Sequence, residues 1–264
     1  MKKGIQDASE IENLGLAVFA TINYSEIGDT KDSRHSNKPI LAISNPTELS
    51  VEAFRSLRTS LHFGMLDAQS RSIAITSSHP GAGKSFSSVN LAAISAQAGQ
   101  NTCLVDADLR RGHLRRYFGV DQSKPGLADI LAGSAELEDC LVSGPTPNLF
   151  FLPTGRYPPN PSELLMRKEL GSLIAKLDSL FDLSILDCPP VLAVTDPVII
   201  ARSVGATILV ARHNVTPVGE LEAALKSFEV GGSKLTGAVL NGFDPKMAKE
   251  GGYGYRYGYE QRKD

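Results

Sequence analysis

Short apolar runs alternate with longer stretches of helical periodicity from Ser72 onward, and this alternation constrains the fold more than any other feature. Strands are expected at 73–76, 103–106, 149–152, 183–187, 207–211 and 238–241. Helices are expected between them, at 84–97, 161–177, 196–203 and 217–230. Strands that are apolar on both faces and joined by helices predict an α/β fold, with a mostly parallel sheet flanked by helices on both faces. Ligands of such sheets bind beyond the carboxyl ends of the strands.

The two ends of the chain are less regular. We expect a short helix at 5–16, a strand at 16–22 and a polar loop at 25–39. A helix is expected at 46–69, with Thr47 as its N-cap and with apolar residues at helical spacing, namely Leu49, Phe54, Leu57, Leu61 and Met65. Near the C-terminus, the sequence GGYGYRYGY has four of the seven tyrosines and no aliphatic side chain. This tail is expected to be flexible and exposed.

A glycine-rich segment, SSHPGAGKS, ends at Ser85 and lies between an expected strand and an expected helix. It follows the phosphate-loop pattern G-x-x-x-x-G-K-[ST], except that the first glycine is replaced by serine. Gly81 and Gly83 let backbone N–H groups turn inward around a phosphate, and the next helix directs its positive dipole end to the same place. Lys84 adds a charge for the β- and γ-phosphates, and the Ser85 hydroxyl is placed to hold Mg²⁺. These features predict a P-loop NTPase fold.

Three carboxylates follow expected strands. Asp106 and Asp108 lie in LVDADLR, and Asp187 lies in ILDCPP. In a parallel sheet these acids share the carboxyl edge with the phosphate loop, where a divalent cation would relieve their mutual repulsion. Asp187 is suited to bind Mg²⁺, either directly or through a water molecule. Of the other two, one can face the metal while the other accepts a proton from an incoming hydroxyl.

Composition narrows the function classes. The net charge of −2 gives no basic field that would favour nucleic acid as a partner. The three cysteines show no pair spacing and are expected to be reduced, as in a reducing cytoplasm. We find no apolar run of about 18 residues and no signal-peptide pattern, so the sequence as given is expected to be soluble.

Taken together, SSHPGAGKS, LVDADLR and ILDCPP resemble the Walker A, Walker A′ and Walker B motifs of the bacterial tyrosine kinases of the Wzc/Etk type. The resemblance spans nearly the whole chain. It includes the E-x-x-R-x-x-R pattern of Glu52, Arg55 and Arg58, the segments PPNPSELL and VTDP, and the terminal tyrosines.

This resemblance implies an ATP- and Mg²⁺-dependent protein-tyrosine autokinase with three parts: a juxtamembrane lead-in at 1–45, a kinase domain at 46–245 and a tyrosine-rich tail at 246–264. The implied catalytic residues are Lys84, Asp106, Asp108 and Asp187, and the implied metal ligands are Ser85, Asp108 and Asp187. Nucleotide binding is expected at Pro80, Gly81, Ala82, Gly83, Lys84, Ser85, Phe86 and Asn241. The expected phosphoacceptors are Tyr253, Tyr255, Tyr257 and Tyr259.

The family also implies wider partners. Glu52, Arg55 and Arg58 would form the interface of a ring, possibly an octamer, in which the tail is phosphorylated in trans. A low-molecular-weight tyrosine phosphatase and the machinery of capsular or exopolysaccharide export would be partners. The chain would be the cytoplasmic domain of a bacterial inner-membrane protein.

Several alternatives stay open. Partition and cell-division ATPases use a similar P-loop as an assembly switch, but they carry a signature lysine where this chain has His79, which favours the kinase. Many relatives have glutamate where this chain has Ala82. A polysaccharide-export scaffold with vestigial kinase activity is a third possibility. Arg110 and Arg111 could contact phosphates, a neighbouring subunit or only solvent, and Asn241 could read the adenine edge or simply end a strand.

Overall fold

An eight-stranded sheet organises the computed structural model, which describes residues 4–27 and 38–245. The strand order is β1-β8-β7-β2-β6-β3-β5-β4, and every pair is parallel except β4 with β5. In chain order the strands are β1 (Val18–Asn23), β2 (Ser72–Ser77), β3 (Thr102–Asp106), β4 (Val142–Ser143), β5 (Leu149–Leu152), β6 (Leu183–Asp187), β7 (Ala206–Arg212) and β8 (Gly237–Phe243). The predicted mostly parallel α/β sheet is confirmed.

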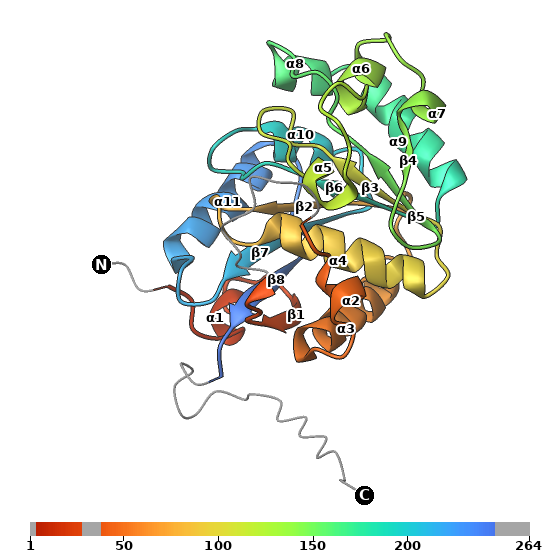
Figure 1. The fold of residues 1–264 in the computed structure, drawn as a ribbon. Coiled ribbons are helices and arrows are strands. Elements are labelled where there is room, and N and C mark those ends of the chain that lie inside the picture. The colour runs from red at the N-terminus through yellow and green to blue at the C-terminus, as the bar shows by residue number, and fades with distance from the viewer. Residues whose placement is uncertain (1–3, 28–37, 246–264) are drawn as a thin grey trace, which may run out of the picture.

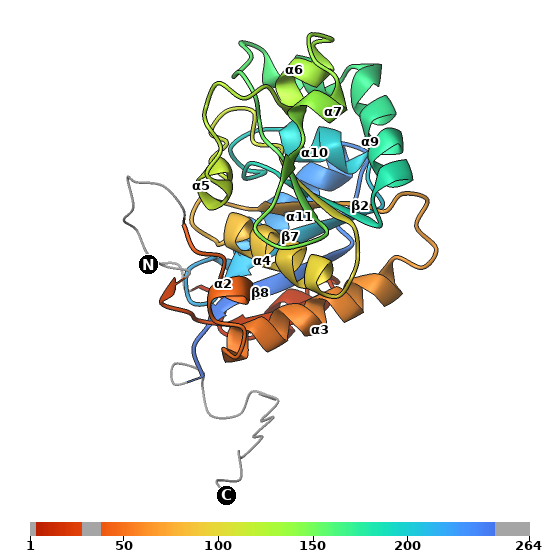
Figure 2. The same cartoon turned by 45° about the vertical axis from the view of Figure 1, so that its right-hand side comes forward.

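Helices cover both faces of this sheet (Figure 1). They are α1 (Ser9–Glu12), α2 (Leu41–Ser44), α3 (Leu49–Gly64), α4 (Lys84–Gln97), α5 (Arg115–Phe118), α6 (Leu127–Leu131), α7 (Leu137–Cys140), α8 (Pro161–Leu165), α9 (Lys168–Leu180), α10 (Asp196–Ala201) and α11 (Val218–Val230). In Figure 2 the long helix α3 lies beside α4 at one side of the sheet, and α9 lies at the other.

The core has two sides because successive strand residues point to opposite faces. On β2, Ile73 and Ile75 belong to the cluster that contains Phe54 of α3, whereas Ala74 belongs to the cluster that contains Leu173 of α9. A third cluster packs α1 and α11 against β7 and β8. All the residues of β2 are buried, so the strand that leads into the phosphate loop is held rigidly at the centre of the sheet.

Some local predictions were wrong. The helix predicted at 161–177 is two helices, α8 and α9, separated at Met166 and Arg167. Leu165 and Leu170 both pack in one core cluster, although in a continuous helix five residues would rotate them about 140° apart. The break between the two helices allows both residues to reach that cluster.

The start of α3 also differs from expectation. Glu48, with extended backbone, precedes the helix, and Thr47 does not cap it but donates to Asn45 Oδ1 at 3.4 Å. Of the apolar residues at helical spacing, Phe54, Leu57 and Leu61 are buried, whereas Leu49 is 72% exposed. The helix expected at 5–16 is reduced to the single turn of α1.

The sheet begins before the predicted domain boundary at residue 46. Strand β1 pairs in parallel with β8, and Ile22 is fully buried in the core. The segment predicted as a lead-in therefore contributes an edge strand to the fold. The predicted phosphoacceptor tyrosines and the predicted flexible tail lie outside the described residues. Among the residues described, no helix combines the length and apolar character needed to span a membrane.

Candidate active site

The phosphate loop connects β2 to α4 and needs glycine in its backbone. Gly81 and Gly83 have φ values of 85° and 94°, in the left-handed region that side chains disfavour. A Cβ on Gly83 would lie 1.9 Å from Nδ2 of Asn241. The loop is braced from β7 and β8, because Arg212 donates to the Gly81 carbonyl and Asn241 donates to the Ala82 carbonyl, both at 3.0 Å.

Asp187, at the end of β6, is the centre of the cluster. It is fully buried and accepts from Lys84 Nζ at 3.2 Å, Ser85 Oγ at 2.6 Å and Ser88 Oγ at 2.9 Å. All three donors lie in the first turns of α4, which therefore faces the strand end. Burial by itself would lower the pKa of Lys84, but attraction by Asp187 and the two other acids outweighs it, so the pKa is raised. Lys84 is accordingly a fixed cation.

Asp106 lies directly beside Asp187, because β3 and β6 are paired in a register that places these two residues opposite each other. Asp106 is 2% exposed, and its Oδ2 accepts the N–H of Leu114 at 2.9 Å. Its buried Oδ1 has no hydrogen-bond partner among the described residues. Burial, followed by repulsion from Asp187, raises the pKa of Asp106 to about 7. Attraction by Lys84 and the Leu114 hydrogen bond therefore offset only part of the cost of burying this charge.

Asp108 is held differently. It is 6% exposed, and its Oδ1 accepts two backbone N–H groups, from Arg110 at 3.2 Å and from Arg111 at 2.9 Å. These bonds orient the carboxylate within the turn that follows β3. Its charge also attracts Lys84, which places it in the same electrostatic cluster as the other two acids.

The cluster fits a cation that also binds phosphate. Among the residues described, no group of three or more His, Cys, Asp or Glu side chains is arranged to hold a metal alone. Mg²⁺ does not require such a group, because it uses one or two carboxylates together with waters and substrate phosphates. The Ser85 hydroxyl and the buried carboxylates of Asp187 and Asp108 provide oxygen ligands of the kind that such a site needs. A void of about 10 Å³ beside Asp106 is large enough for about one water.

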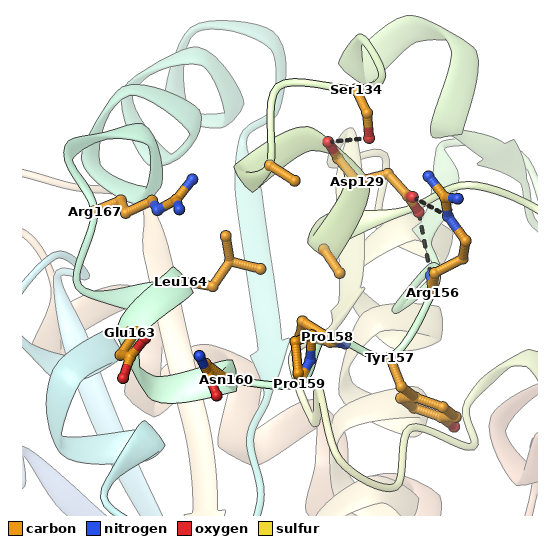
Figure 3. Close-up of a pocket in the computed structure, with 12 residues that line it drawn as sticks. Asp129, Ser134, Arg156, Tyr157, Pro158, Pro159, Asn160, Glu163, Leu164 and Arg167 are labelled. Atoms are coloured by element: carbon orange, nitrogen blue, oxygen red, sulfur yellow. Dashed lines mark hydrogen bonds and ion pairs between the residues drawn. The ribbon is translucent and has the colours of Figure 1, made fainter.

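A larger pocket, of about 450 Å³, lies elsewhere, between α6, α8 and residues 156–160. Figure 3 shows Arg167 across this pocket from the ion pair of Asp129 with Arg156. None of the predicted nucleotide or metal residues lines it. Tyr157 lines this pocket, and its hydroxyl donates to the carbonyl of Gly112, in the turn that follows Asp106 and Asp108, at 2.8 Å. The phosphate loop, and not this pocket, is therefore the candidate nucleotide site.

The structure brings some predicted residues together and leaves others apart. The loop 80–86, Asn241 and the three acids meet at one end of the sheet. Glu52 and Arg55 form an exposed ion pair at 2.6 Å on α3, where the predicted interface remains a prediction. His79 pairs with Glu220 of α11 at 2.7 Å.

The sequence reasoning missed Ser88 and Arg212. Ser88 lies four residues after Lys84, which places both on one face of α4 and could have been noticed. Arg212 could not have been found in this way, because it contacts the phosphate loop only through the pairing of β7 beside β2.

Comparison with known proteins agrees with this geometry. A model of the AAA domain family matches residues 70–214. The tyrosine-protein kinase Wzc of Salmonella typhimurium is 40% identical over 270 residues, in a match that covers 99% of this chain and 37% of that protein. The solved kinase domain of the Escherichia coli tyrosine kinase ETK superposes with a TM-score of 0.86 at 39% identity, covering 96% of this chain and all of that domain.

The chain belongs to the bacterial tyrosine kinase family. It corresponds to the kinase domain of this family and spans about 37% of the length of Wzc. The septum site-determining protein MinD of Pyrococcus horikoshii is more distant, with a TM-score of 0.52 at 27% identity over 64% of this chain. The tyrosine-kinase likeness extends to the N-terminal strand and α3, whereas the likeness to MinD does not cover the whole domain.

Proposed function

We propose that this domain is an ATP-dependent protein-tyrosine autokinase whose acceptors are Tyr253, Tyr255, Tyr257 and Tyr259. One observation supports this most strongly: Lys84 and Ser85 of the phosphate loop bond Asp187, while Asp106 lies opposite Asp187 with an unpartnered oxygen. Phosphate-binding groups and a candidate base thus occupy one cluster, within a family named for tyrosine kinases.

In the proposed reaction, the phosphate loop and Lys84 bind the β- and γ-phosphates, and Lys84 stabilises the charge that moves onto the bridging oxygen. Asp106 accepts the proton of the tyrosine hydroxyl as the phenolic oxygen bonds to the γ-phosphorus. The bond from that phosphorus to the bridging oxygen breaks, and ADP leaves. Mg²⁺, when held by Ser85, Asp108 and Asp187, would neutralise phosphate oxygens. Most of the rate enhancement would come from positioning and charge neutralisation.

The decisive experiment is intact-mass analysis after incubation with Mg²⁺ and ATP. We expect gains of whole phosphate units that map to residues 253–259, and no gains for Lys84→Met or Asp106→Asn. Release of free phosphate with unchanged protein mass would instead support a nucleotide-switched assembly ATPase, the alternative that the likeness to MinD suggests. His79 counts against that alternative, because it occupies the position of the signature lysine and pairs within its own chain.

The wider roles belong to the same proposal. The polar face of α3 with Glu52, Arg55 and Arg58 would join subunits in a ring, which allows phosphorylation in trans. The whole protein would be anchored in a bacterial inner membrane, with this domain in the cytoplasm. It would regulate capsular or exopolysaccharide polymerisation and export. A low-molecular-weight tyrosine phosphatase would remove the phosphate groups from its tyrosines. If Lys84→Met leaves polymer export intact, the domain acts there as a scaffold and not through its kinase activity.

A further inference from the structure

A bidentate ion pair lies beside the catalytic cluster. Arg110 donates from Nε to Asp196 Oδ2 at 2.9 Å and from Nη2 to Asp196 Oδ1 at 3.1 Å. Ser162 completes the group, because its hydroxyl accepts from Arg110 Nη2 at 2.9 Å and donates to Asp196 Oδ1 at 2.6 Å. Asp196 is fully buried, and these donors satisfy its carboxylate oxygens. Two forked bonds fix the orientation of the guanidinium as well as its position.

This group joins three segments that are far apart in the sequence. Arg110 lies in the turn after β3, Ser162 is the second residue of α8, and Asp196 is the first residue of α10. Ser162 and Asp196 belong to PPNPSELL and VTDP, two segments to which the proposed reaction assigns no task. The chain between Asp187 and α10 also runs beside the phosphate loop, where Val191 N–H donates to the Ser77 carbonyl at 2.8 Å.

The anchored arginine also supports one of the acids. The backbone N–H of Arg110 donates to Asp108 Oδ1, as does that of Arg111. The main chain of Arg110 thus orients the Asp108 carboxylate, while its side chain ties the same turn to Asp196. A movement of the guanidinium would displace the N–H groups that hold Asp108.

We propose that Arg110, Asp196 and Ser162 form a clamp that positions Asp108 for the nucleotide-bound cation. The clamp rests on the proposed function of the site, and its members are positioning residues because Asp108, and not they, would meet the cation. Supports of this kind around a metal ligand typically change metal affinity by about 10–100-fold when they are removed.

The chain contains a matched control for a purely structural role. Arg156 donates from Nε to Asp129 at 2.9 Å, the same distance as in the clamp, and the Asp129 side chain is only 5% exposed. This second pair lines the pocket of Figure 3 and has no bond to Asp108. Replacing arginine by lysine keeps the charge in each pair, but it removes a forked guanidinium contact only from the Arg110 pair, because the Arg156 side chain donates to Asp129 through Nε alone.

The test is a Mg²⁺ titration of the binding of a fluorescent ADP analogue to the full chain, with the melting temperature of each variant measured in parallel. For Arg110→Lys and Asp196→Asn, we expect the half-saturating Mg²⁺ concentration to rise by about tenfold. Ser162→Ala should cause a smaller rise in the same direction. Arg156→Lys should stay within about twofold of the wild type.

Two outcomes would overturn the clamp: a folded Arg110→Lys variant with the wild-type Mg²⁺ midpoint, or an equal shift in Arg156→Lys. If both Arg110→Lys and Asp196→Asn melt below the assay temperature, the ion pair serves the stability of the fold, and this result would also overturn the clamp. Intact-mass measurements on the wild type separate the two proposals. Absent phosphorylation with intact Mg²⁺-dependent ADP binding would refute the kinase function but leave the clamp standing.

Discussion

Asp106→Asn should change the pH dependence of stability in the metal-free, nucleotide-free domain. Measured against the wild type, the free energy of unfolding of the variant should be higher at neutral pH than at acid pH. The Asp106 side chain is 2% exposed and stands opposite Asp187. Burial, and then the charge of Asp187, raise its pKa from 3.8 to about 7. Asparagine has a similar shape without an ionisable proton, so it removes this pH dependence while it keeps an oxygen for the N–H of Leu114.

The sign follows from proton binding. Between the unfolded and folded pKa values, folded Asp106 keeps a proton that the unfolded chain has lost, so the free energy of unfolding falls as pH rises. The slope is about 1.4 kcal/mol per pH unit, which amounts to about 2–3 kcal/mol between about pH 5 and pH 7. This contribution is fully present below the unfolded pKa and is lost as pH rises through the folded pKa. The Asn variant should therefore gain about 2–3 kcal/mol relative to the wild type over that interval.

The assay is urea denaturation in the presence of a chelator, at several pH values from about 5 to about 8, for wild type and variant. Asp139→Asn, which changes an exposed acid on α7, is the control and should show no comparable trend. A difference between Asp106→Asn and wild type that stays constant within about 0.5 kcal/mol across this range would refute the burial reasoning.

Three further predictions test the same site. Ser88→Ala removes a donor to the buried carboxylate of Asp187 and should lower the free energy of unfolding by about 1–3 kcal/mol in urea denaturation; an unchanged midpoint would contradict it. Gly112→Ala should lower kcat by about tenfold or more in the phosphorylation assay, because its Cβ would lie 1.9 Å from Thr154 Oγ1 and 2.9 Å from Asp106 Oδ2; wild-type rates would show that the turn can move. Asn241→Ala should weaken ATP and GTP binding in parallel, by about tenfold at most, because its amide braces the phosphate loop; a changed ATP-to-GTP ratio in equilibrium binding would show that it reads adenine.

Local sequence was sufficient for the parts of this domain that depend on near neighbours. Short apolar runs located seven of the eight strands among the described residues, and the glycine spacing located the phosphate loop. Acids were expected at one sheet edge because parallel strands end on the same side, and Asp106 and Asp187 do lie in register there. Boundaries were less certain, as the break between α8 and α9 shows, because a helix ends where the packing of its apolar face requires it.

Only the tertiary structure decided which distant side chains meet. Nothing in the local pattern places β8 between β1 and β7, yet this order brings Asn241 to the phosphate loop. In the same way, Arg110 was read as a possible phosphate or subunit contact, whereas it pairs with Asp196, 86 residues away. Strand order and loop packing minimise the free energy of the whole core, so such contacts depend on every segment at once. The sequence determined which chemical groups stand at the strand ends, and the fold determined which of them face one another.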